Sequence, residues 1–163
     1  MKKILILFLV VSSTTFGQKK LDKLLDKWNT RNVPYISVET LAMPKTDAIL
    51  LDAREENEFN ISHLENAICV GYDNFKIKET IAKLPKDKNA KIVVYCSLGI
   101  RSETVAHKLI QEGYTNVYNL YGGIFEWKNA DFKVIDTLGK STEKVHTFNK
   151  SWSKWLKKGE KVY

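Results

Sequence analysis

The sequence feature that most constrains the fold is a series of short apolar runs that alternate with segments of helical periodicity. Each run has four or five residues, and nearly all of them are apolar, which is typical of strands buried on both faces of a parallel sheet. The runs are Ala48–Leu51, Ala67–Val70, Lys91–Tyr95 and Val117–Tyr121, and the helical segments are Phe75–Leu84, Ser102–Gln111 and the residues after Gly122-Gly123. The pattern predicts an α/β fold with a mainly parallel sheet covered by helices on both sides.

The size and cysteine content of the chain limit its organisation. A chain of 163 residues with 44% hydrophobic content can bury one sizeable core, so we expect one domain with attachments. The two cysteines, Cys69 and Cys96, allow at most one disulfide. They do not form the C-x-x-C spacing that is typical of a structural zinc site.

The first 17 residues have the layout of a signal peptide. Lys2 and Lys3 precede the apolar run Ile4–Val11, and small and polar residues follow up to Gly17. The run is far shorter than the roughly 20 residues that a permanent membrane span needs. We therefore expect export without a permanent span, to the periplasm of a Gram-negative cell or otherwise outside the cell. Residues 18–34 are predicted to be an amphipathic helix and linker, from the helical spacing of Leu21, Leu24, Leu25 and Trp28.

Positive charge is concentrated in a C-terminal extension, residues 137–163. This segment has seven lysines against two glutamates, whereas residues 18–136 have equal numbers of basic and acidic residues. A neutral body argues against a nucleic-acid-binding domain. Apolar residues recur in the extension at helical spacing, namely Val145, Phe148, Trp152, Trp155 and Leu156. We expect a helix that either docks on the domain or contacts an anionic surface.

Cys96 lies where catalytic groups gather in parallel sheets. It directly follows the apolar run Lys91–Tyr95, and the loop Ser97–Arg101 leads from it into a predicted helix. Backbone N–H groups at a helix N-terminus, together with the guanidinium of Arg101, favour a negative charge there. They would hold Cys96 as a thiolate, which is the nucleophilic form of a cysteine.

These residues form part of an ordered set of motifs over residues 35–136. The set consists of Leu50–Glu55 with Glu58-Phe59, Ser62–Ile68, Val94–Cys96 with Arg101-Ser102, and Leu120–Gly123 with Trp127. In this set and its order the chain resembles the rhodaneses, a family of sulfurtransferase domains. It departs from the family where Ser62 replaces the usual Gly and Glu65-Asn66 replaces the usual Pro-Gly, changes that we expect to alter a turn.

The resemblance implies a five-stranded, mainly parallel sheet and a persulfide carried by Cys96. The sulfur would come from thiosulfate, a polysulfide or a persulfide and pass to a thiol or cyanide. By the same resemblance, backbone N–H groups of Ser97, Leu98, Gly99, Ile100 and Arg101 would hold the persulfide, with no metal or organic cofactor. Asp52, Arg54 and Ser102 would support the site.

Several alternatives remain open from the sequence. The domain could bind or carry sulfur without turnover, and phosphatases and arsenate reductases share the fold. Those relatives have five residues between Cys and Arg, whereas only four separate Cys96 from Arg101 here. The apolar Leu98 and Ile100 favour a protein persulfide, a polysulfide or a small thiol as partner over the anionic thiosulfate.

Four side chains near the predicted site have interpretations that need no catalytic role. Glu58 is close enough in sequence to form a structural ion pair with Arg54, and His63 is expected to bond to the backbone. Cys69 is either a small buried side chain or a resolving thiol for Cys96.

Overall fold

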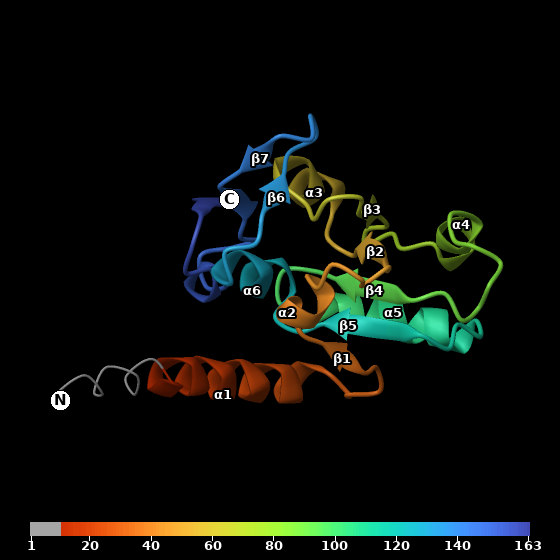
Figure 1. The fold of residues 1–163 in the computed structure, drawn as a ribbon, viewed down its shortest axis with the longest axis horizontal. Coiled ribbons are helices and arrows are strands. Elements are labelled where there is room, and N and C mark those ends of the chain that lie inside the picture. Colours follow the sequence, from red (N-terminus) through yellow and green to blue (C-terminus); the bar gives the residue numbers. More distant parts are fainter. Residues whose placement is uncertain (1–10) are drawn as a thin grey trace, which may run out of the picture.

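The computed structural model describes residues 11–163, and its centre is a five-stranded sheet in which every pairing is parallel (Figure 1). The strand order is β1-β5-β4-β2-β3. The strands are β1 (Tyr35–Ile36), β2 (Ile49–Asp52), β3 (Ile68–Cys69), β4 (Ile92–Tyr95) and β5 (Val117–Leu120). The predicted fold class is therefore confirmed, and the four predicted runs correspond to β2, β3, β4 and β5.

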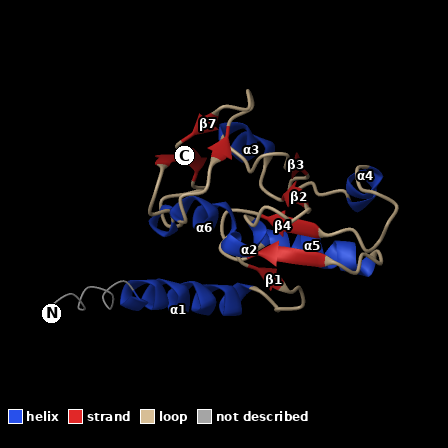
Figure 2. Ribbon diagram, viewed as in Figure 1, coloured by secondary structure: helices blue, strands red, loops and turns tan. Residues whose placement is uncertain are grey.

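Helices cover both faces of this sheet (Figure 2). They are α1 (Val11–Trp28), α2 (Val38–Leu41), α3 (Glu56–Ile61), α4 (Ile77–Ala82), α5 (Arg101–Gln111) and α6 (Gly123–Asn129). Side chains alternate along β4: Val93 and Tyr95 join the core with α1, α2 and α6, whereas Val94 and then Cys96 join the core with α5. The catalytic candidate Cys96 therefore lies on the α5 side of the sheet.

Helix α1 packs on the domain through part of its predicted apolar face. Leu21 and Leu25 are buried in the core, which confirms an amphipathic helix in the predicted region. Trp28 is 61% exposed, so the apolar face ends before this residue. Residues 1–10 of the predicted signal peptide lie outside the described residues, and its predicted end at Gly17 falls inside α1. None of the described helices is long and apolar enough to cross a membrane.

The prediction of a helix in the C-terminal extension is wrong. The end of the chain forms β6 (Val134–Ile135), β7 (Ser141–Thr142), β8 (Lys144–His146), a 3-10 turn (Ser153–Trp155) and β9 (Glu160–Val162). Phe148 has φ +63°, a left-handed conformation that interrupts a right-handed helix, and Asn149 Oδ1 then accepts the backbone N–H of Trp152 in a turn. The helical spacing of the apolar residues was therefore coincidental.

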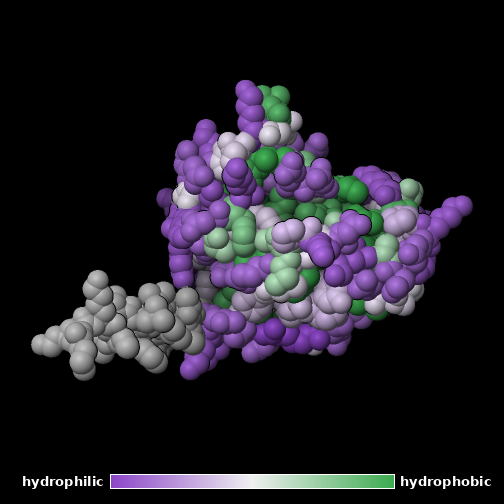
Figure 3. Space-filling model, in the orientation of Figure 1, coloured by the Kyte–Doolittle hydropathy of each residue, from purple (hydrophilic) through white to green (hydrophobic). Residues whose placement is uncertain are grey.

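The extension nevertheless packs onto the domain. β8 pairs in parallel with β9, and the side chains of Val145 and Leu156 are buried in the core beside Ile124 and Phe125 of α6. Much of the surface in the view of Figure 3 is hydrophilic, with hydrophobic residues gathered mainly near its middle. In Figure 1 the C-terminal strands lie beside α3 and α6. This places the extension next to the helix that carries Glu58.

Candidate active site

Cys96 begins the loop between β4 and α5, and the loop closes tightly around its sulfur. The Cys96 side chain is fully buried, as are Ser97, Leu98 and Gly99. The backbone N–H of Gly99 donates to Cys96 Sγ at 3.2 Å. Gly99 has φ +99°, a conformation that favours glycine and turns this N–H back towards the sulfur. Of the five backbone N–H groups predicted to hold a persulfide, that of Gly99 donates to the sulfur of Cys96 itself. The side chain of Leu98 packs in the core.

The surroundings of Cys96 favour its thiolate. The hydroxyl of Ser102, in the first turn of α5, lies 3.5 Å from Cys96 Sγ. Burial by itself raises the pKa of a thiol, but the Arg101 charge and hydrogen bonds from Ser102 and Gly99 more than offset it. The pKa of Cys96 is therefore lowered below its ordinary value, which suits a nucleophile.

Arg101 is held by Glu58, a pairing that the sequence analysis did not predict. Arg101 Nη1 and Nη2 donate to Glu58 Oε2 and Oε1 at 2.7 and 2.9 Å. Nη2 also donates to Ser97 Oγ at 3.1 Å. Burial would raise the pKa of Glu58, but the hydrogen bonds and charge of Arg101 outweigh it and lower that pKa. The predicted Arg54–Glu58 ion pair is wrong, because α3 turns Glu58 towards the loop.

Asp52 and Arg54 instead form their own ion pair at the end of β2. Arg54 Nη2 donates to Asp52 Oδ2 and to the Ser62 carbonyl, both at 2.6 Å, and the side chains of Asp52 and Arg54 are fully buried. The hydrogen bonds recorded for these two side chains join them to each other and to Ser62 rather than to the Cys96 loop. They support the sheet edge and do not touch the sulfur.

Two residues of this site were missed from the sequence. Asn119 of β5 accepts from Ser102 Oγ through Oδ1 at 2.7 Å and donates from Nδ2 to the Gly99 carbonyl at 2.8 Å. The sequence signal that could have pointed to Asn119 is a polar amide side chain within the apolar run Val117–Tyr121. Gly123 brings α6 against the loop: a Cβ there would lie 2.2 Å from the Cys96 carbonyl oxygen, so no larger residue fits. The following Ile124 N–H donates to that oxygen at 2.9 Å.

The C-terminal extension contacts the outer side of the Arg101–Glu58 pair. Arg101 Cζ lies 5.1 Å from the centroid of the Phe148 ring. His146 Nδ1 accepts the Phe148 N–H and lies 3.8 Å from Glu58 Oε1. Burial has the largest effect on the pKa of His146 and, with smaller contributions from Arg54 and Arg101, lowers it although the Glu58 charge acts in the opposite direction. A neutral imidazole therefore faces Glu58, and the extension forms part of the wall around the site.

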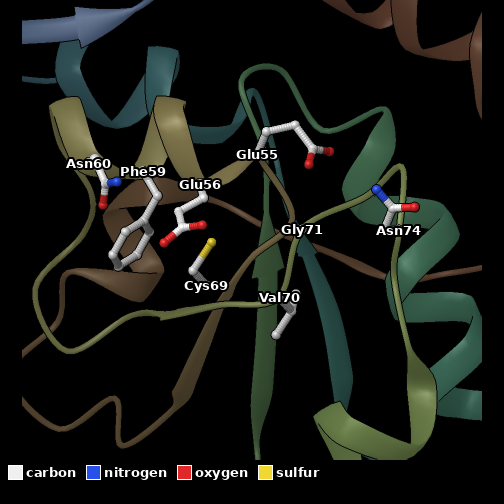
Figure 4. Close-up of a pocket in the computed structure, with 8 residues that line it drawn as sticks. All are labelled: Glu55, Glu56, Phe59, Asn60, Cys69, Val70, Gly71 and Asn74. Carbon is white, nitrogen blue, oxygen red and sulfur yellow. The ribbon is translucent and has the colours of Figure 1, made fainter.

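Cys69 lies apart from Cys96, beside a cavity of about 350 Å³. In Figure 4 its thiol lies near Glu56 and Phe59, in a cavity that Glu55, Asn60, Val70, Gly71 and Asn74 also line. Burial and the nearby Asp52 raise the pKa of this thiol. Because β2 separates β3 from β4, the two cysteines are two strand spacings apart, about 10 Å. A disulfide needs Cα atoms about 4.4–6.8 Å apart, so both cysteines are free.

His63 has the structural role predicted for it. Its Nδ1 lies 3.1 Å from the Phe59 carbonyl oxygen, and its ring stacks on the Phe59 ring. Among the described residues, no group of three or more His, Cys, Asp or Glu side chains comes together as a metal site.

The chain is similar to known proteins over its sheet and loop. A family model described as a rhodanese-like domain matches residues 38–130. The chain is 33% identical over 118 residues to a tRNA uridine(34) hydroxylase of Hamiltonella defensa, an alignment that covers 71% of this chain and 31% of that protein. The corresponding protein of Erwinia tasmaniensis is 36% identical over 83 residues, which cover 50% of this chain and 24% of that one. The chain thus spans about a third or less of these curated relatives.

Solved structures agree with the architecture. A rhodanese-related protein from Thermoplasma volcanium superposes with a TM-score of 0.55 at 26% identity, over 63% of this chain and 97% of that one. A thiosulfate sulfurtransferase from Pseudomonas aeruginosa superposes with a TM-score of 0.59 over 76% of this chain and 23% of that one. Its identity is 21%, so this second likeness concerns the fold alone.

Proposed function

This chain belongs to the rhodanese-like domain family, and we propose that it is a sulfurtransferase that moves a sulfane sulfur through a persulfide on Cys96. The observation that carries the proposal is the contact between the Gly99 N–H and Cys96 Sγ at 3.2 Å. With Ser102 and the charge of Arg101, this donor favours a sulfur anion in a site that excludes water. The four residues between Cys96 and Arg101 make a loop that fits one sulfur atom rather than a phosphate.

The proposed reaction has two displacement steps. The Cys96 thiolate attacks the sulfane sulfur of the donor, and the donor's bond to that sulfur breaks with its electron pair on the leaving group, which is sulfite when thiosulfate is the donor. The negative charge then lies on the terminal sulfur of the Cys96 persulfide. An acceptor thiolate or cyanide attacks that terminal sulfur, and the Cys96 thiolate is released. No net oxidant or reductant is consumed.

The electrostatics of the loop favour a persulfide or polysulfide donor over thiosulfate. Two nitrogens of Arg101 already donate to Glu58, so a thiosulfate dianion would have to compete with that carboxylate for the guanidinium. Ile100 is only partly buried and adds apolar surface to the loop instead of a second cation, whereas Leu98 is buried in the core. We therefore propose that the physiological donor is an organic persulfide or polysulfide, which carries one negative charge where thiosulfate carries two.

The hydroxylase activity named for the curated relatives is a weaker candidate. The alignment covers 31% or less of those proteins, so more than two thirds of each has no counterpart in the alignment. The neutral charge of residues 18–136 also offers little electrostatic attraction to RNA.

We further propose that residues 1–17 act as a signal peptide. The proposal rests on the sequence pattern of two lysines, an apolar run and small residues before Gln18. The intact mass of the protein recovered after expression with the native N-terminus tests it. Mature protein that begins near Gln18 in the exported fraction is expected, whereas full-length protein retained in the cytoplasm contradicts export.

The sulfurtransferase proposal is tested with the full chain and its Cys96→Ser and Cys69→Ser variants. Each is incubated with thiosulfate or polysulfide, sulfur transfer to cyanide is measured, and a one-sulfur adduct is sought by intact mass. We expect adduct and turnover in the wild type and in Cys69→Ser, and neither in Cys96→Ser. An adduct without turnover would indicate a sulfur carrier instead. Absence of both with every donor would contradict the proposal and leave a binding module.

A further inference from the structure

The carbonyl of Gly99 accepts hydrogen bonds from two side-chain amides that come from opposite parts of the chain. One donor is Nδ2 of Asn119 in β5, and the other is Nδ2 of Asn29, directly after α1, each at 2.8 Å. A carbonyl oxygen has two lone pairs, so both are used. The neighbouring N–H of the same residue is the one that donates to Cys96 Sγ.

Asn29 lies outside residues 38–130, the part of the chain that matches the family model. It is held in place by contacts of its own segment. Its Nδ2 also bonds to the hydroxyl of Tyr35, whose oxygen donates to Glu103 in the first turn of α5. Glu103 in turn accepts from Thr30 and from the backbone N–H of Arg31. The segment after α1 is therefore fastened to Glu103 of α5 at three residues that follow its contact with the loop, namely Thr30, Arg31 and Tyr35.

We propose that Asn29 is a positioning residue for the sulfur-transfer reaction, which orients Gly99 so that its N–H faces the Cys96 sulfur. The inference rests on the proposed function of Cys96 but concerns a segment that the family match does not include. Asn29 acts through the backbone of Gly99: it holds the carbonyl, which belongs to the peptide with Ile100, whereas the N–H that donates to the sulfur belongs to the peptide with Leu98.

The backbone of Gly99 explains why this residue needs an external hold. Glycine reaches left-handed and right-handed conformations at similar cost, so a peptide flanked by Gly99 rotates more easily than one flanked by other residues. Gly99 has φ +99°, and its carbonyl and N–H are fixed by separate partners. Loss of the hydrogen bond from either amide loosens the Gly99 carbonyl, so the backbone at Gly99 moves more freely. The Gly99 N–H then spends less time directed at Cys96 Sγ. The thiolate loses part of its stabilisation as a result.

The test measures the thiolate of Cys96 directly in Asn29→Leu, which retains the approximate size of the side chain but has no donor. In a Cys69→Ser background, Cys96 is the only cysteine of the chain, so ultraviolet thiolate absorbance against pH reports its pKa. We expect the pKa to rise by about half a unit, which lowers the thiolate fraction about threefold at a pH below the pKa. The rate of modification by methyl methanethiosulfonate should fall by the same factor at that pH and converge with the wild type at high pH.

Two further variants separate positioning from general packing. Asn29→Ala must reproduce the shift, and it replaces Asn29→Leu if that variant fails to fold. Asn116→Leu is the matched control, because it makes the same substitution and removes a bond of the same kind, from Nδ2 to the Asn89 carbonyl at 3.1 Å, away from the Cys96 loop. The pKa of Cys96 should stay at the wild-type value in this variant. A folded Asn29 variant with an unchanged pKa, or an equal shift in Asn116→Leu, would overturn the inference. The titration needs no turnover, so failure of the sulfurtransferase proposal would not be mistaken for failure of this one.

Discussion

Two arginine–carboxylate pairs lie near the catalytic edge of the sheet, and their surroundings give them different roles. Arg54 and Asp52 are two residues apart, have fully buried side chains, and bond to each other and to the Ser62 carbonyl. Arg101 and Glu58 are 43 residues apart, and the Arg101 side chain remains 11% exposed. Arg101 also bonds to Ser97 of the catalytic loop. The first pair is closed on itself within the fold, whereas in the second pair the charge of Arg101 lowers the pKa of Cys96.

The largest expected effect comes from breaking the Asp52–Arg54 pair. Arg54→Met leaves the carboxylate of Asp52 buried without its counter-ion, which we expect to cost about 3–5 kcal/mol of unfolding free energy. Urea denaturation of the variant and the wild type measures this loss. The variant should show little folded protein at moderate urea, whatever its activity.

The double variant Asp52→Leu/Arg54→Met provides the control for this prediction. Removing both charges should recover more than half of the lost stability, because the unpaired buried carboxylate causes most of the cost. If Arg54→Met is as stable as the wild type, the pair has no structural role and the contrast with Arg101 fails.

The second prediction concerns Arg101→Met, which removes charge from the active site. The Cys96 thiolate then loses the charge that lowers its pKa most, while Glu58 remains, so the pKa of Cys96 should rise. A rise of one unit lowers the thiolate fraction about tenfold at a pH below the pKa, and turnover should fall at least that much. Sulfur transfer measured across a pH series checks this, and part of the deficit should disappear at alkaline pH.

Lys76→Met serves as the matched control for Arg101→Met. Lys76 pairs with Glu79 on the surface, where both side chains are about two thirds exposed, and such pairs contribute little to stability. Its turnover should equal that of the wild type. Equal activity of Arg101→Met and Lys76→Met would show that Arg101 does not tune Cys96.

The smallest expected effect is the pH-dependent stability contributed by Glu58. Its pKa in the folded protein is lowered by Arg101, so it stabilises the fold at pH values above its unfolded pKa. That contribution is lost as the pH falls through the folded value. Glu58→Gln should therefore be less stable than the wild type by about 1 kcal/mol near neutral pH. The difference should vanish in acid.

Urea unfolding of Glu58→Gln and the wild type over a series from neutral to acidic pH measures this dependence. A constant difference between the two proteins at every pH would mean that the carboxylate charge is not what Arg101 stabilises. The contact between residue 58 and Arg101 would then stabilise the fold independently of the charge on the carboxylate.

Local patterns in the sequence were sufficient for the sheet and for the position of Cys96. Short apolar runs predict buried strands because a residue in a two-sided parallel sheet is apolar whichever way it points. In the turn at Glu65-Asn66, Asn66 has φ +61°, a left-handed conformation that asparagine tolerates. The prediction of a C-terminal helix was wrong because the spacing of apolar residues cannot reveal the left-handed conformation of Phe148, which interrupts a helix.

The sequence by itself determined the strands, the loop after β4 and the place of Cys96 at the start of that loop, because these depend on residues close to one another along the chain. Only the tertiary structure decided that Glu58 pairs with Arg101 rather than Arg54, and that Asn29 and Asn119 share the Gly99 carbonyl. These partners lie 43, 70 and 20 residues apart. The chemistry of a side chain determines whether it binds a charged group or a carbonyl. Which charged group or carbonyl it contacts depends on how distant elements of the chain pack.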